Sequence, residues 1–141
     1  MLVNLDTRSY LYSGRMKKFL NFLLLISSFF GYLEWPPDNH GFIFQLEADL
    51  LRIAINNIMS VAHPFILLPF AGQLILLITL FQSSPRRWLT VTGMLCTGIL
   101  LLLFLLVGLL KANVWMVAST LPFILISLLV LKIHFQQKSG L

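Results

Sequence analysis

Histidine is the first residue type in this sequence that could carry chemistry. The chain has three histidines, His40, His63 and His134. His63 and His134 lie near opposite ends of apolar segments, whereas a haem held by two histidines needs both at a similar depth. His40 and His63 are the candidates for an outer-side contact with quinone or haem; the alternative for His63 is a histidine bonded to water, a lipid head group or a loop. No third ligand at metal-site spacing accompanies them, so we predict no metal site and no resident cofactor.

Three further residues interrupt long apolar runs. Gln73 is expected to hydrogen-bond to another helix, because an unpaired amide in hydrocarbon is costly. Pro69 and Pro122 should kink the helices that contain them, which membrane helices tolerate where neighbours satisfy the freed carbonyls. Together with His63, these residues could line a path for a small solute. The alternative is that they serve only the packing of the helices.

Catalytic motifs are missing from the sequence. A single cysteine, Cys96, excludes an internal disulfide, a CxxC redox pair and a cysteine-based zinc site. We find no Ser-His-Asp set, no HExxH, no phosphate loop and no cluster of carboxylates. No catalytic residue is predicted, and an enzyme is the less favoured class of protein.

The composition is that of an integral membrane protein. Of the 141 residues, 58% are hydrophobic and 11% are charged, and the mean hydropathy is +0.89. A soluble protein carries charge on about a quarter of its residues, and Leu-rich runs of this length would expose large apolar patches in water. No polar stretch is long enough to form a separate soluble catalytic domain.

Four segments are long enough to cross a bilayer, which takes about 20 mainly apolar residues. They are residues 17–35, 59–81, 88–110 and 114–134. Lysines precede the first segment and Tyr32 and Trp35 close it, as at the two surfaces of a membrane; Pro36 and Pro37 should end its helix. A cleaved signal peptide is the disfavoured alternative, because bulky residues occupy the expected cleavage site. The predicted fold is one all-α membrane domain, a bundle of four transmembrane helices over residues 1–141.

The connection over residues 36–58 should lie outside and contain an amphipathic helix at the membrane interface. Leu46, Leu50 and Ile53 recur near helical spacing, but Glu47 and Leu51 lie four residues apart, so the polar and apolar faces are not cleanly separated. The alternative is one long helix over residues 45–81. Five side chains are the candidates for contact with a partner protein: Phe42, Phe44, Leu46 and Leu50 on the outer side, and Trp88 at the inner boundary.

Basic residues predict the orientation, because lysine and arginine prefer the cytoplasmic side of short loops. Eight of the 10 basic residues fall on one side of the four-span arrangement, which places both termini in the cytoplasm of a bacterial-type inner membrane. Residues 1–16 form the cytoplasmic amino-terminal segment. Met16 resembles a natural start, so residues 1–15 are expected to be a poorly structured extension. The basic residues form no single patch, and no nucleic acid partner is predicted.

Short loops, uniformly apolar helix faces and the missing catalytic set favour a small accessory or structural subunit. Its partners would be the lipid bilayer and the larger integral subunits of a membrane complex, with no disulfide partner. The first alternative is a homo-oligomeric transporter or channel for a small solute. The second alternative is a membrane redox or lipid enzyme that uses a histidine.

Overall fold

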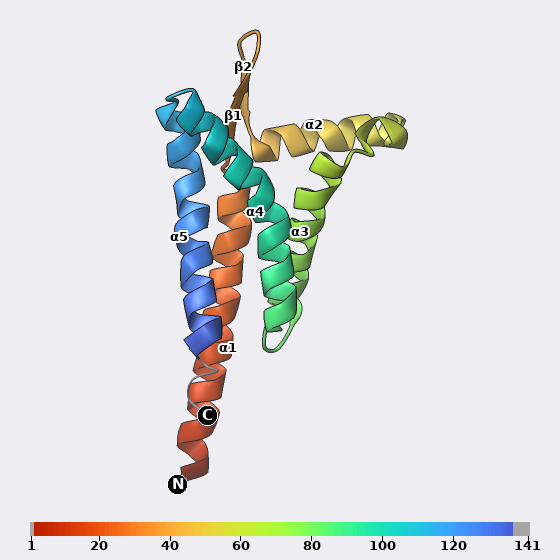
Figure 1. The fold of residues 1–141 in the computed structure, drawn as a ribbon. Helices are drawn as coiled ribbons and strands as arrows, with labels where there is room; N and C mark the ends of the chain where they lie inside the picture. Colours follow the sequence, from red (N-terminus) through yellow and green to blue (C-terminus); the bar gives the residue numbers. More distant parts are fainter. Residues whose placement is uncertain (1, 137–141) are drawn as a thin grey trace.

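The computed structural model describes the backbone of residues 2–136 and the side chains of residues 13–135. The protein is mostly helical, with one short hairpin at one end of the helix bundle (Figure 1). The elements are α1 (Leu2–Phe29), β1 (Tyr32–Trp35), β2 (Asn39–Phe42), α2 (Ile43–Asn56), the 3-10 turn η1 (Ile58–Val61), α3 (Pro64–Phe81), α4 (Arg87–Leu110) and α5 (Val114–Gln136).

Three helices are long and apolar enough to cross a membrane. They are Pro64–Phe81, Arg87–Leu110 and Val114–Phe135, with 18, 24 and 22 residues. At a rise of about 1.5 Å per residue, helices of this length match a hydrocarbon core of about 30 Å. They correspond to the second, third and fourth segments predicted from the sequence, and they indicate an integral membrane protein in contact with lipid.

The prediction of a fourth transmembrane helix over residues 17–35 is wrong. α1 ends at Phe29, and Tyr32–Trp35 is a strand. The helical part of the predicted segment, from Lys17 to Phe29, is about 20 Å long, and α1 is not among the three helices of the described residues that are long and apolar enough to cross a membrane. The helix stops before Pro36 because the chain turns at Gly31, whose carbonyl accepts a hydrogen bond from the Ile43 amide at 2.9 Å.

Glycine at position 31 permits this turn. A Cβ there would lie 2.6 Å from Ile43 Cδ1 and 2.7 Å from Leu101 Cδ2, closer than carbon atoms can pack. The hairpin that follows pairs β1 with β2 in antiparallel register, with Tyr32 opposite Phe42. The two strands are an addition to the all-α fold that the sequence predicts.

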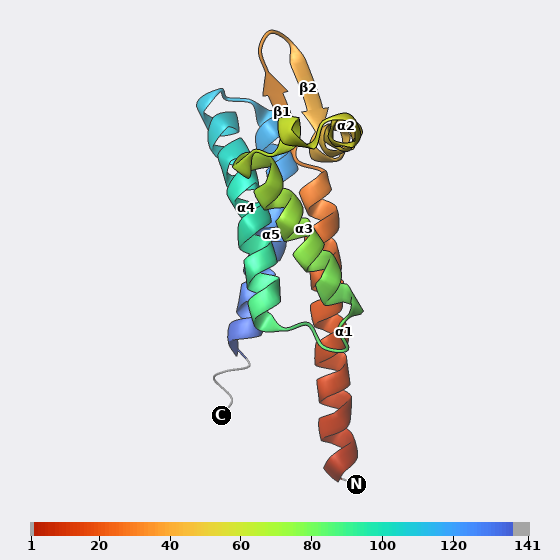
Figure 2. The ribbon, with the colours of Figure 1, turned by 90° about the vertical axis from the view of Figure 1, so that its right-hand side faces the viewer.

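α1 is one continuous helix from Leu2, so the expectation of a poorly structured segment over residues 1–15 is wrong for the backbone that the structure describes. Its amino-terminal part projects beyond the other helices, and its remainder packs against α3 and α5 (Figures 1 and 2). Leu24 and Asn21 of α1 are completely buried. The core of the bundle therefore includes a helix that is not among the three candidate transmembrane helices found in the described residues.

α2 and α3 are separate helices, which excludes the alternative of one helix over residues 45–81. Asn57 ends α2 in extended backbone, and its side-chain oxygen accepts from the Met59 amide at 3.2 Å. α3 begins at Pro64, a residue well suited to the first turn of a helix. α2 crosses the top of the bundle at a steep angle to α3 (Figures 1 and 2).

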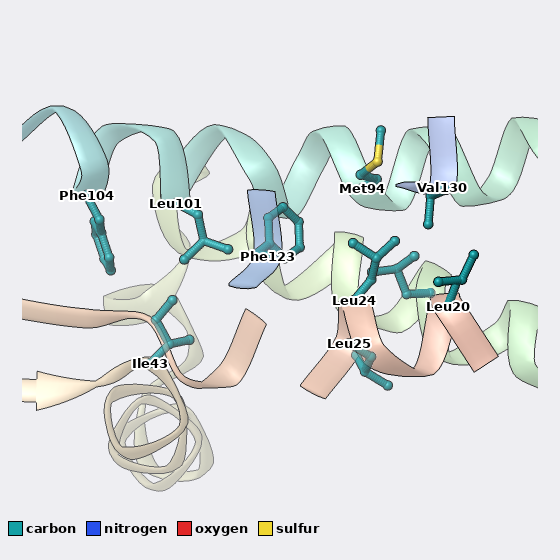
Figure 3. Packing of buried hydrophobic residues seen from close by; sticks show 10 residues of the cluster. Leu20, Leu24, Leu25, Ile43, Met94, Leu101, Phe104, Phe123 and Val130 are labelled. Carbon is teal, nitrogen blue, oxygen red and sulfur yellow. The ribbon is translucent and has the colours of Figure 1, made fainter. Parts of the chain in front are cut away.

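The hydrophobic core runs along the inside of the bundle. Leu20 and Leu24 of α1 meet Met94 of α4 and Val130 of α5 in its lower half (Figure 3). The other buried members of the cluster are Leu25, Ile43, Leu76, Leu101, Phe104 and Phe123. Ile43 is the one residue of α2 in this cluster, and it joins the amino-terminal end of α2 to the bundle.

Candidate functional site

Two glycines, Gly72 and Gly93, let α3 and α4 approach each other closely. A Cβ on Gly72 would lie 2.5 Å from Thr97 Oγ1 and 2.8 Å from the Gly93 carbonyl oxygen. A Cβ on Gly93 would meet Leu76 Cγ at 2.9 Å. Small residues permit such close backbone approach in membrane helices. From this point of contact, α3 and α4 diverge towards the end of the bundle at which α2 lies (Figure 1).

A groove of about 390 Å³ lies where α3 and α4 diverge, and α2 forms its roof. Such a volume is within the range of small-molecule sites, at about 300–1,000 Å³. Leu51, Phe65 and Leu67 in its lining are half exposed, so the groove is open. The rest of its lining comes from α2 (Ile43, Leu46, Glu47, Leu50 and Ala54), α3 (Ile66, Pro69 and Phe70), α4 (Leu100 and Phe104), and Leu33, Ile58 and Val61.

Glu47 is the one ionisable residue in the lining of this groove. Burial among the apolar side chains raises the pKa of the Glu47 carboxyl above its usual value, and a hydrogen bond from the Gln73 side chain acts in the opposite direction. The other charged residues of α2, Asp49 and Arg52, are exposed and pair with each other at 3.5 Å. Glu47 is therefore a carboxyl without a charged neighbour in this apolar lining, where it can accept or donate a proton or a hydrogen bond.

A network of buried polar side chains joins the helices below the groove. The Gln73 amide nitrogen donates to Ser28 Oγ at 3.3 Å, which ties α3 to α1. Two turns earlier on α1, the Asn21 amide nitrogen donates to Thr79 Oγ1 of α3 and to Thr90 Oγ1 of α4, both at 2.8 Å. All five side chains are buried. Each of the five side chains makes at least one hydrogen bond within the protein, as the hydrocarbon interior favours, whereas Asn21 Oδ1 is buried without a partner among the described residues.

A second feature is an aromatic surface, which we define as Phe30, Tyr32, Phe42 and Phe44. The rings of Phe42 and Phe44 stack at 5.7 Å, and Tyr32 meets Phe42 edge to face at 5.3 Å. Phe30 meets Phe44 at 6.3 Å. Three of these residues also line a hollow of about 480 Å³ beside α5, together with Trp115, Ala118, Ser119 and Pro122.

The histidines predicted as cofactor contacts lie apart. His40 is exposed in the hairpin, with its ring 6.1 Å from that of Tyr32. His63 is exposed at the start of α3, where its Nδ1 accepts from the Phe65 amide at 3.3 Å. The length of α2, about 21 Å, separates the two positions along the chain. Among the described residues, no group of three His, Cys, Asp or Glu side chains is arranged to hold a metal ion.

The four residues proposed to line a solute path face different surroundings. Pro69 is buried and lines the groove under α2, and Gln73 is buried in the polar network. Pro122 is exposed beside the aromatic surface, and His63 caps α3. No cavity described in the structure is lined by more than one of these four.

The predicted interface residues divide among three places. Phe42 and Phe44 belong to the aromatic surface, whereas Leu46 and Leu50 line the groove. Trp88 is 74% exposed at the start of α4, and Arg87 beside it lies 4.0 Å above the ring of Phe135.

Sequence reasoning placed Glu47 on the polar face of α2 and missed its position in the groove. A signal was available, because Glu47 lies between Leu46 and Leu50 and four residues before Leu51. Phe30 was taken for part of a transmembrane helix, so its contact with Phe44 was also missed. The hydrogen-bond partners of Asn21 lie on two other helices. Which side chains meet in this way depends on how the helices cross, and the sequence does not show that crossing.

No family model, characterised protein or solved structure matches this chain. The structure supports a small helical membrane protein with three candidate transmembrane helices, an open apolar groove and an exposed aromatic surface.

Proposed function

We propose that this protein is a small accessory subunit of an integral membrane complex, and that it binds a larger membrane subunit through the aromatic surface. The observation that carries the proposal is the mutual packing of Phe30, Tyr32, Phe42 and Phe44 at the surface, where Tyr32 and Phe42 are half-buried. Phe30 and Phe44 are 53% and 44% exposed. Aromatic residues are enriched in protein interfaces, where rigid rings bury a large area at little entropic cost.

Hydrogen bonds hold this surface in place, which supports its role as a preformed binding site. The Tyr32 amide donates to Ser119 Oγ of α5 at 2.9 Å. The Asn113 side-chain amide, before α5, donates to Glu34 of β1 at 2.6 Å. A surface ordered in this way loses less conformational freedom on binding than a flexible loop does.

The hollow beside α5 gives this surface the shape to receive part of a partner. Trp115 and Pro122 lie on α5, whereas Phe30 directly follows α1 and Phe42 lies on β2. A helix or loop of a larger subunit could insert a side chain between these elements. Fully desolvated aromatic pockets of this kind often dominate binding energy.

The proposed location is a bacterial-type inner membrane with the hairpin and α2 outside. α1 begins and α5 ends at the opposite end of the bundle from the hairpin (Figure 1). Lys17, Lys18, Arg86 and Arg87 lie towards that end, which accords with the preference of basic residues for the cytoplasm. In this orientation α2 lies at the outer surface of the membrane.

The test is affinity purification of the full chain in mild detergent, followed by native mass spectrometry. We expect one larger integral membrane protein to co-purify at a fixed ratio. Phe44→Ala and Phe30→Ala should each lower its recovery by about tenfold, the loss expected for a central aromatic contact.

Phe19→Ala is the matched control, because Phe19 is 58% exposed but lies on α1 away from the aromatic surface. It should leave recovery of the partner unchanged. A protein that is monomeric and free of partners in mild detergent contradicts the proposal. Equal losses in all three variants contradict the role of the aromatic surface.

A further inference from the structure

We propose that the groove between α2, α3 and α4 binds an aminophospholipid of the phosphatidylethanolamine class, with one acyl chain between α3 and α4 and the head-group ammonium against Glu47. The groove shares no lining residue with the aromatic surface. The inference therefore stands apart from the proposed subunit role.

The lining of the groove argues for an acyl chain. Fifteen of its sixteen lining residues are apolar, and α3 and α4 are both candidate membrane spans. An opening between two such helices faces the hydrocarbon interior, and the occupant with the most ready access there is lipid. The volume of about 390 Å³ is sufficient for a flexible chain of drug-like size.

The close contact at Gly72 and Gly93 gives the groove a floor. Above this contact, Pro69 and Phe70 of α3 face Leu100 and Phe104 of α4 as opposite walls. The absence of a Cβ at Gly72 and Gly93 lets the two helices approach closely at this point. The groove is thus a feature of the helix crossing.

Glu47 argues for the head group. A carboxylate at an apolar surface is stabilised by an ammonium partner more than by any neutral group. Arg52, the one basic residue of α2, already pairs with Asp49 on the exposed side of the helix. Charge complementarity therefore favours a lipid with a primary amine and disfavours an anionic lipid without one, such as phosphatidylglycerol.

The position of α2 puts the Glu47 carboxyl at the end of the groove where the head group of a bound lipid would lie. α2 lies at the hairpin end of the bundle, where Figure 2 shows it end-on, and at this end α3 begins and α4 ends. The lipid would enter sideways from the bilayer, with its amine beneath α2. The Gln73 side chain is near enough to the Glu47 carboxyl to lower its pKa, against the effect of burial.

The experiment is native mass spectrometry of the delipidated full chain after addition of equal amounts of phosphatidylethanolamine and phosphatidylglycerol with identical acyl chains. We expect a preference of about tenfold for phosphatidylethanolamine, from one charge-assisted hydrogen bond at a partly buried site. Glu47→Gln keeps the size of the side chain and should abolish the preference. Asp49→Asn, the matched control on the exposed side of the same helix, should retain it.

A photoactivatable residue at Ala54, in the lining of the groove, tests the occupant without removing Glu47. Irradiation in membranes should yield an adduct with the mass of a phospholipid. Equal retention of both lipids by the unaltered protein, an undiminished preference in Glu47→Gln, or a polypeptide adduct at Ala54 would each overturn the proposal.

Discussion

Asn21 gives the sharpest test of how this bundle is held together. Its side-chain amide donates to Thr79 of α3 and to Thr90 of α4, both at 2.8 Å, and the residue is completely buried. One side chain therefore links three helices. We expect Asn21→Ala to destabilise the protein by removing both hydrogen bonds at once.

The expected magnitude follows from the environment of the two bonds. Hydrogen bonds between membrane helices contribute about 0.6 kcal/mol on average, with values up to about 1.7 kcal/mol. The substitution also leaves a small cavity between the helices, which adds to the loss. We therefore expect Asn21→Ala to lower the free energy of unfolding by about 1–3 kcal/mol.

The assay is reversible unfolding in mixed micelles with increasing SDS, followed by tryptophan fluorescence. A double-mutant cycle with Thr79→Val isolates the pairwise term, for which we expect a coupling of about 0.6–1.7 kcal/mol. Asn56→Ala is the control, because Asn56 is exposed and bonds only to the Arg52 carbonyl of its own helix. It should change stability by less than about 0.5 kcal/mol.

The reasoning is refuted if Asn21→Ala is no more destabilising than Asn56→Ala. A coupling energy of zero with Thr79 would show that the hydrogen bond adds nothing to stability. In that event the packing of the helices alone would account for the bundle.

Three further predictions address the helix crossing, the groove and the orientation. Gly72→Ala should destabilise the protein by about 1–3 kcal/mol through overpacking, whereas Gly98→Ala should be tolerated because a Cβ there lies 3.4 Å from the nearest atom; SDS unfolding measures both. Burial raises the pKa of the Glu47 carboxyl. In delipidated protein, the contribution of protonated Glu47 to the free energy of unfolding is therefore fully present at low pH, and it is lost as the pH rises from the unfolded to the folded pKa of this group. SDS unfolding across this pH range should show this loss of stability in the unaltered protein and not in Glu47→Gln. In a variant without Cys96, a cysteine at Asp38 should react with an impermeant thiol reagent in intact cells and one at Ser84 only after lysis; the reverse pattern would contradict the proposed orientation.

Much of the architecture could be predicted from hydropathy alone. The three helices that could cross a membrane match three predicted segments, because long apolar runs can satisfy their backbone in lipid only as helices. Pro64 marked the start of α3, and Asn57 and the turn after it separated α3 from α2. These are local signals that do not depend on contacts between distant residues.

The end of the first apolar segment could not be predicted in the same way. Residues 17–35 are apolar enough to span a bilayer, yet the chain leaves the helix at Phe29. Just after this point, Gly31 accepts a hydrogen bond from the Ile43 amide and lies close to the Leu101 side chain, and both residues are distant in sequence. Hydropathy measures only the preference for lipid, so it cannot show that a segment turns back to pair as a hairpin.

The sequence by itself determined the class of the protein and the location of three candidate spans, because hydrophobicity and helix length are properties of short contiguous stretches. Only the tertiary structure decided which polar groups meet and where a cavity forms. Glu47 of α2 lies near Gln73 of α3 because of the way α2 packs at the end of the bundle, and Asn21 reaches Thr79 and Thr90 because of the way α1, α3 and α4 cross. That crossing depends on close approach at two glycines of different helices, a geometry that no single stretch of sequence contains.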